Sequence, residues 1–189
     1  MGGGDRRPSP HHRLGAVRDT ELMAKWFEDI GARLRRQVKD LDEDALEWRA
    51  DNRGNNIRET VWHMARWIDV LTRLLDGTQP STERWFTDGW AERTRYDPRG
   101  IGDDGLGVLS GYTFEEVLAI PRLSSSELLQ YVDSVIAPLA QHLRALPDDE
   151  SATKSVRRPN RILQGCFAHI GEIDALLAIR ERSAQRASA

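Results

Sequence analysis

The chain is poor in cysteine and has no long apolar run, and each absence excludes a class of protein. Cys166 is the single cysteine among 189 residues, so no intrachain disulfide can form and a disulfide-stabilised secreted scaffold is excluded. No apolar stretch approaches the roughly 20 residues that a membrane-spanning helix needs. The arginines near the amino terminus are followed by no apolar segment of a signal peptide. We therefore expect a cytoplasmic protein without a membrane partner.

Excess charge of one sign is also missing. The formal net charge of −3 is too small to indicate a nucleic-acid partner. The apolar share of 39% and the charged share of 30% are typical of a soluble globular domain with short tails. Alternating strand patterns of any length are absent as well, so the sequence predicts an all-α fold.

Four amphipathic segments predict a four-helix bundle. Apolar residues recur every three or four positions over residues 19–41, 56–77, 124–146 and from 160 onward, the spacing of helices that bury one face. Asn56 with Glu59, and Ser124 with Glu127, have the spacing of capping boxes. Gly77 is expected to end the second helix. We expect residues 1–18 to be a disordered tail, 19–182 to be the bundle and 183–189 to be a second tail.

The connection between the second and third helices is unusually long. Residues 78–123 contain Trp85, Trp90 and Tyr96 among many glycines and prolines, with a short capped helix at 113–120. So long a connection in a compact domain often carries function or crosses a bundle. Its aromatic residues either cover the bundle or a subunit interface, which we favour, or line a ligand pocket.

Several segments resemble the DinB-like family. The second predicted helix contains VWHMARWID at residues 61–69, and the last contains HIGEI at 169–173, both similar to the corresponding helices of that family. The segments DGWAER at 88–93 and YTFEEV at 112–117 are similar to one uncharacterised branch. The resemblance covers about residues 20–182. It implies a four-helix bundle with a long crossover between helices 2 and 3, and a homodimer.

The resemblance also implies a metal site. Many relatives bind a divalent metal, Zn or Ni, through one histidine on the second helix and two on the last, four residues apart. His63 matches the ligand on the second helix, and His169 matches the later of the two ligands on the last helix. The earlier ligand of the last helix would fall at position 165, which is Gly165. A third ligand is then expected from Glu172, three residues after His169, or from His142 on the third helix.

Two functions follow as hypotheses. Some relatives are transferases or isomerases that use mycothiol or bacillithiol, which suggests a divalent-metal-dependent thiol transferase or hydrolase with a degenerate metal triad and a low-molecular-weight thiol as ligand. The alternative is a non-catalytic bundle that binds a small apolar ligand or a partner protein. His63 and His169 are then core histidines. A catalytic pair without metal is a third interpretation of these two residues. No catalytic residue and no organic cofactor is assigned.

Other residues have simpler interpretations. Residues 100–105 spell G-x-G-x-x-G but follow no strand, so we interpret them as a loop. Cys166 falls on the apolar stripe of its helix and is expected to be buried.

Trp62 is expected to project to the surface, which adds support for a dimer. Arg66 is expected on a polar face, either solvated or paired with Asp69.

Overall fold

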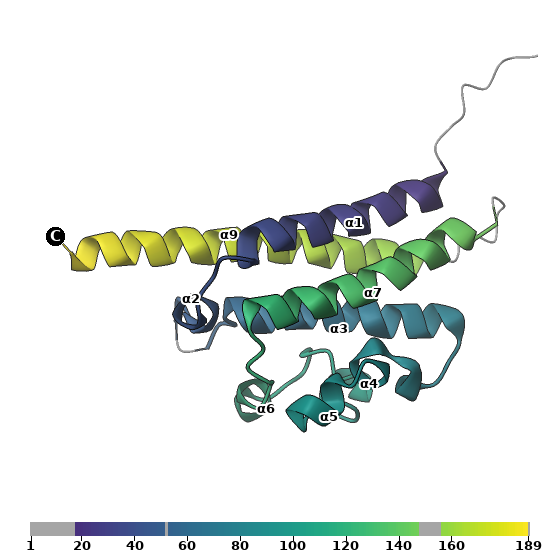
Figure 1. Ribbon diagram of the computed structural model, residues 1–189, viewed down its shortest axis with the longest axis horizontal. Helices are drawn as coiled ribbons and strands as arrows, with labels where there is room; N and C mark the ends of the chain where they lie inside the picture. Colours follow the sequence, from purple (N-terminus) through teal and green to yellow (C-terminus); the bar gives the residue numbers. More distant parts are fainter. Residues whose placement is uncertain (1–17, 52, 148–155, 189) are drawn as a thin grey trace, which may run out of the picture.

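Four long helices form a bundle in the computed structural model, which describes residues 18–51, 53–147 and 156–188. They are α1 (Asp19–Val38), α3 (Ile57–Asp76), α7 (Ser125–Ala145) and α9 (Arg157–Ala187). Helices α1 and α9 run in one direction and α3 and α7 in the other (Figure 1). Helix α1 packs against α7, and α9 packs against α3. Within the parallel pairs, α1 also contacts α9 and α3 contacts α7. No strand occurs among the described residues, which confirms the predicted all-α four-helix fold.

The predicted capping residues set the helix ends. Asn56 accepts a hydrogen bond from the Glu59 backbone at 2.8 Å, and the Glu59 carboxylate accepts one from the Asn56 backbone at 3.0 Å. Ser124 and Glu127 form the same reciprocal pair at the start of α7. Gly77 ends α3 with a φ of 65°, a left-handed conformation that suits glycine. Local chemistry alone therefore positions these ends.

Three helix boundaries differ from the sequence prediction. The helix expected over residues 19–41 is shorter, because α1 ends at Val38. A separate short helix, α2 (Glu43–Glu47), begins after Asp42. Helix α9 begins before Pro159 rather than after it, since the first helical turn tolerates proline. It also continues to Ala187 instead of ending at residue 182, because residues 183–187 contain no glycine or proline. Residues 1–17 of the expected amino-terminal tail lie outside the described residues.

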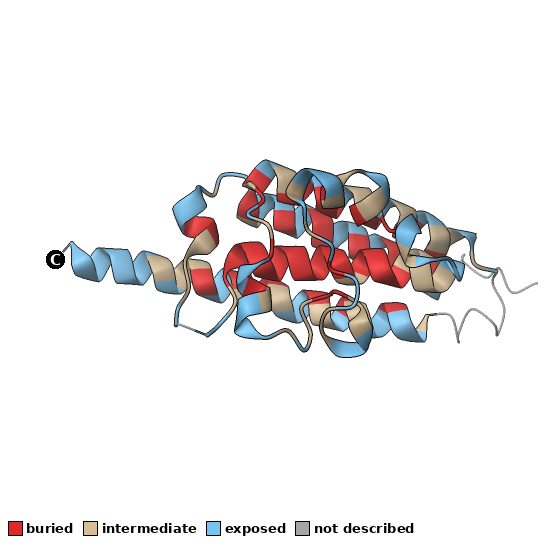
Figure 2. Cartoon of the chain, turned by 90° about the horizontal axis from the view of Figure 1, so that it is seen from below, coloured by how far each residue is buried: buried red, intermediate tan, exposed pale blue. Residues whose placement is uncertain are grey.

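Helix α9 is amphipathic and has one widely exposed face. Among the described helices it is the one that is long and apolar enough to cross a membrane, judged by length and composition, which corrects the expectation that no apolar stretch approaches that length. Its most apolar window has a mean hydropathy of 1.4 and is 28% buried. It packs against α1 and α3 through Leu163, Cys166, Ile170 and Ile173, so we assign it to the bundle. Its last turns project beyond the other helices and are exposed (Figure 2).

The crossover between α3 and α7 consists of short turns that lie across one side of the bundle (Figure 1). The sequence predicted an irregular segment with one short helix, and the structure shows five short elements. They are η1 (Pro80–Thr82), α4 (Arg84–Thr87), α5 (Trp90–Thr94), η2 (Asp103–Gly105) and α6 (Phe114–Leu118). The crossover thus adds a partial second layer over α3 and α7.

Trp62 lies beneath this layer, so the prediction that it is exposed was wrong. It is fully buried, with its ring centroid 5.9 Å from those of both Trp85 and Tyr96. Trp85 stacks on Trp90 and packs edge-on against Tyr131 of α7. The crossover aromatics therefore cover the bundle, as favoured from the sequence. The homodimer stays a prediction, and Trp62 no longer supports it.

Arg66 is also fully buried between α3 and the crossover, which corrects the expectation of a solvated side chain. Its Nη2 donates to Glu83 at 2.9 Å, and its Nε donates to the Gly107 carbonyl oxygen at 3.1 Å. Its Nη1 donates at 3.3 Å to both Asp69 and Tyr131. The predicted pairing with Asp69 is thus confirmed, but within a buried network.

Asp69 completes the attachment of the crossover. Its carboxylate accepts hydrogen bonds from the backbone N–H groups of Arg84 at 2.7 Å and Trp85 at 2.9 Å, and from the Tyr131 hydroxyl at 2.8 Å. Arg73 donates to the second oxygen of Glu83 at 3.0 Å. Arg66 and the two carboxylates are therefore buried, and the partly buried Arg73 brings the total charge of the network to neutral. Desolvated charges persist in this way only when each is paired and hydrogen-bonded.

Replacing Arg66 should destabilise the protein strongly. Arg66→Met leaves the Asp69 and Glu83 carboxylates buried with one of their cations missing. Removing one partner of a buried ion pair typically costs about 3–5 kcal/mol, and we expect a loss of this size in the free energy of unfolding, measured with urea.

Arg58 provides the matched control, because its side chain is nearly as buried at 3% exposed. Its partners Glu43 and Glu47 are 65% and 34% exposed, so water can solvate them once Arg58 is removed. Arg58→Met should therefore cost clearly less than Arg66→Met. Equal losses would contradict the special role of the Arg66 network.

Candidate functional site

His63 on α3 and His169 on α9 meet where the two helices pack together. Their ring centroids are 4.9 Å apart, and the ring planes stand at 90° to each other. His63 is buried at 8% exposed, and His169 is half-buried. The structure thus brings together the two histidines that the sequence singled out.

His63 is held as a neutral ring in one tautomer. Its Nδ1 is hydrogen-bonded to the Val108 carbonyl oxygen in the crossover. Burial lowers the pKa of His63 to about 4, and the Val108 bond offsets only part of that effect. Because a carbonyl oxygen only accepts, the single N–H of the neutral ring lies at Nδ1. The Nε2 atom therefore keeps a lone pair that can accept a proton or a hydrogen bond.

His169 is oriented by a carboxylate one turn further along α9. Its Nδ1 lies 2.8 Å from Glu172 Oε2, and this hydrogen bond is the main cause of the lowered pKa of Glu172. A carboxylate in this position fixes the orientation of the ring, as it does for histidines that bind metals. Glu172 thus serves as the hydrogen-bond partner of His169, and the Nε2 atom of His169 is the one left for a ligand.

Of the two residues expected as a third metal ligand, Glu172 contacts Nδ1 of His169, whereas His142 is not brought to this pair. His142 is 2.7 Å from Asp76, which lies thirteen residues beyond His63 and hence about 20 Å further along α3. Gly165 offers no donor atom. Among the described residues, no three His, Cys, Asp or Glu side chains are grouped so that they could hold a metal ion. The residues present do not make up a three-ligand site, and a metal at His63 and His169 stays a prediction.

A cavity of about 570 Å³ opens beside the histidine pair, between α3 and α9. This volume is within the usual range of small-molecule sites, about 300–1,000 Å³. Its lining combines apolar side chains from α3, α9 and the crossover with charged, hydroxyl and imidazole side chains. The lining residues are His63, Met64, Trp67, Leu71, Leu74, Asp103, Asp104, Leu106, Ser110, Arg158, Arg161, Ile162, Gly165, Cys166 and His169.

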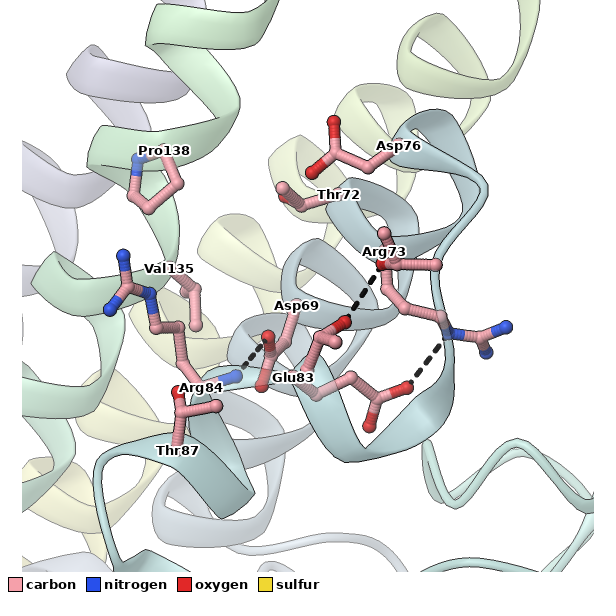
Figure 3. A pocket seen from close by; sticks show the side chains of 11 residues that line it. Asp69, Thr72, Arg73, Asp76, Glu83, Arg84, Thr87, Val135 and Pro138 are labelled. Carbon is pink, nitrogen blue, oxygen red and sulfur yellow. Dashed lines mark hydrogen bonds and ion pairs between the residues drawn. The ribbon is translucent and has the colours of Figure 1, made fainter.

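A second cavity, of about 300 Å³, lies where the crossover meets α3 and α7. Figure 3 shows its polar lining, in which Arg73 contacts Glu83 and the backbone of Arg84 contacts Asp69. These charges belong to the buried network and already satisfy one another. We therefore regard the histidine cavity as the candidate functional site.

Part of this site was detectable in the sequence and part was not. Trp67 and Leu74 follow His63 on α3 at successive spacings of four and seven residues, which keep them on one side of the helix, and they are half-buried cavity walls. No sequence pattern indicated that Arg158 and Arg161, on either side of Pro159, belong to a site. Only the packing of α9 on α3 brings them to the cavity. Cys166 is buried as predicted, and burial raises the pKa of its thiol to about 12, which leaves it unreactive.

Comparison with known proteins gives a family and a fold. The family model described as "DinB superfamily" matches residues 27–183. The crystal structure of the conserved protein of a locus from Enterococcus faecalis is similar, with a TM-score of 0.66 and 15% sequence identity over 85% of this chain and 96% of that one. At that identity the likeness concerns the fold alone. No curated protein sequence matches the chain.

The buried neutral state of His63 should make stability depend on pH. In the unfolded chain its pKa is near 6.5, and in the folded protein it is about 4. The unfolded state therefore binds a proton first, and the contribution of His63 is present above pH 6.5 and lost as the pH falls towards 4. Between pH 7.5 and 4.5 we expect a loss of roughly 2–3 kcal/mol from this residue.

His63→Gln is the comparison that isolates this effect, because its amide can still donate to Val108 but does not titrate. Urea unfolding at both pH values should show a smaller loss at low pH for His63→Gln than for the natural protein. The same pH dependence in both proteins would show that His63 is not buried as the neutral ring.

Proposed function

The chain belongs to the DinB superfamily, and we propose that it binds a small organic molecule in the cavity between α3 and α9. The observation that carries this proposal is an apolar cavity of about 570 Å³ beside two imidazole rings, each held by a hydrogen bond at its Nδ1 atom. Apolar walls with a few fixed polar groups are typical of ligand sites.

The histidine pair gives the cavity a defined polar centre. His63, neutral at pH 7, offers Nε2 as an acceptor for a hydroxyl or thiol proton of the ligand. His169 lies beside it, with its Nδ1 hydrogen-bonded to Glu172. Two neighbouring imidazoles with different environments can hold and pass on a proton, which is the usual requirement of general acid–base catalysis. Binding of the ligand is the function proposed, and proton transfer is the chemistry available to it.

A metal-dependent thiol transferase or hydrolase is the second candidate. It is favoured by the carboxylate–histidine contact between Glu172 and His169, an arrangement common around metal-ligating histidines. Catalytic zinc sites usually use three protein ligands, whereas this chain supplies two imidazoles. We therefore place this candidate after ligand binding without metal.

Gly165 allows the cavity to be filled without disturbing the bundle. A Cβ atom at this position would meet no heavy atom within 4 Å, and replacing a helical glycine gains up to about 1 kcal/mol. Gly165→Leu should therefore fold at least as stably as the natural protein but lose most of its affinity for 1-octanol. Binding is measured by NMR from the shift of the Trp67 indole signal.

Gly171→Leu is the matched control. Gly171 lies in the same helix, also has no heavy atom within 4 Å of a Cβ, and does not line the cavity. This variant should bind 1-octanol as the natural protein does. The proposal would be contradicted by a natural protein that does not bind 1-octanol, or by equal binding in all three proteins.

The metal candidate has its own test at the same position. In a helix, residues i and i+4 lie on one face, so Gly165→His should place a third imidazole beside His169. This variant should bind Zn²⁺ or Ni²⁺ more tightly than the natural protein by calorimetry, and His63→Ala should remove the gain. Tight binding already in the natural protein would raise the metal-dependent candidate to first place.

A further inference from the structure

The histidine cavity is polarised along its length. The crossover residues Asp103 and Asp104 lie near the end that contains His63, because the Asp103 backbone N–H donates to the Ser110 carbonyl oxygen at 2.8 Å, two residues after the Val108 carbonyl group that contacts that ring. Arg158 and Arg161 lie at the other end. Each end thus carries charge of one sign, and the middle is apolar.

The two arginines share one face of the first turns of α9. They are three residues apart, so their side chains project in nearly the same direction. The helix begins with no acidic residue in its first turn and no side-chain cap at Val156, which adds to the positive potential there. Among the described residues, no carboxylate lies within ion-pair distance of either guanidinium.

The distance between the two ends indicates the shape of the ligand. Arg161 precedes His169 by eight residues, which corresponds to about 12 Å along the helix axis. Trp67, Leu74 and Ile162 line the interval. A molecule that contacts both ends must therefore have an apolar body of several carbon atoms between its two polar groups.

Resting on the proposed function, we infer that the ligand is an aliphatic carboxylate. Its carboxylate binds Arg158 and Arg161, its chain lies against Trp67 and Leu74, and its far end reaches the histidine pair. The planar guanidinium groups match a carboxylate in geometry and charge. The buried His63, whose Nε2 has no hydrogen-bond partner among the described residues, faces the opposite end of the same cavity.

The charges also define what the cavity excludes. Asp103 and Asp104 repel a second anionic group at the histidine end, which disfavours dicarboxylates and nucleotides that extend over the whole cavity. A fatty acid with the carboxylate at the arginine end meets no such repulsion. The orientation of the ligand is thus set by charge, and its affinity by the length of its chain.

The experiment compares octanoate with 1-octanol on the full chain at low ionic strength, using the Trp67 indole signal. Octanoate should bind about ten-fold more tightly or better, since hydrogen bonds to charged groups contribute more than neutral ones. Affinity should rise about four-fold for each methylene added between hexanoate and octanoate. Added salt should weaken octanoate but not 1-octanol.

Variants assign the effect to the arginines. The double variant Arg158→Gln with Arg161→Gln should lose the preference for octanoate and keep its affinity for 1-octanol. Arg157→Gln removes a charge from the same turn, from a residue that does not line the cavity, and should change neither. An equal loss for both ligands in the double variant would overturn the inference, because the arginines would then shape the cavity rather than bind a carboxylate.

The inference and the proposed function fail in different ways. If 1-octanol binds and octanoate binds no more tightly, the carboxylate inference is wrong and ligand binding in the cavity stands. If neither molecule binds the natural protein, the proposed function itself is wrong.

Discussion

The guanidinium of Arg66 joins the crossover to the bundle. It contacts Glu83 and the Gly107 carbonyl oxygen from the crossover, and Asp69 and Tyr131 from the helices beneath. His63, one turn earlier on α3, contacts the next carbonyl oxygen, that of Val108. A single face of α3 therefore binds two consecutive carbonyl groups of the crossover, one through a structural side chain and one through the candidate functional side chain.

This arrangement makes the site depend on the crossover. Burial beneath it keeps His63 neutral, and the Val108 carbonyl oxygen selects the tautomer that leaves Nε2 available. The crossover folds closely on itself at Gly107, where φ is 65° and an added Cβ would lie 2.3 Å from the carbonyl oxygen of Pro98, also in the crossover. Only glycine fits there. The long segment that looked irregular in the sequence thus supplies one wall of the cavity and sets the protonation state of its central residue.

The sequence was informative where the determining signals are local. Helical periodicity and capping pairs such as Asn56–Glu59 predicted the bundle, and the positions of His63 and His169 predicted that these rings meet. It failed where contacts join distant segments. Trp62 and Arg66 were predicted to be surface residues because the crossover that covers them is formed by residues further along the chain. Arg158 and Arg161 have no motif of their own and reach the cavity only through the packing of α9 on α3.

Buried charge pairing should fix the crossover to the bundle as one cooperative unit. Native-state hydrogen exchange at the amides of Arg84 and Trp85, which donate to Asp69, tests this most directly. We expect both amides to exchange only through global unfolding, with the same free energy and the same dependence on urea as amides in the middle of α3. Exchange through a local opening of clearly lower free energy, with little dependence on urea, would contradict it.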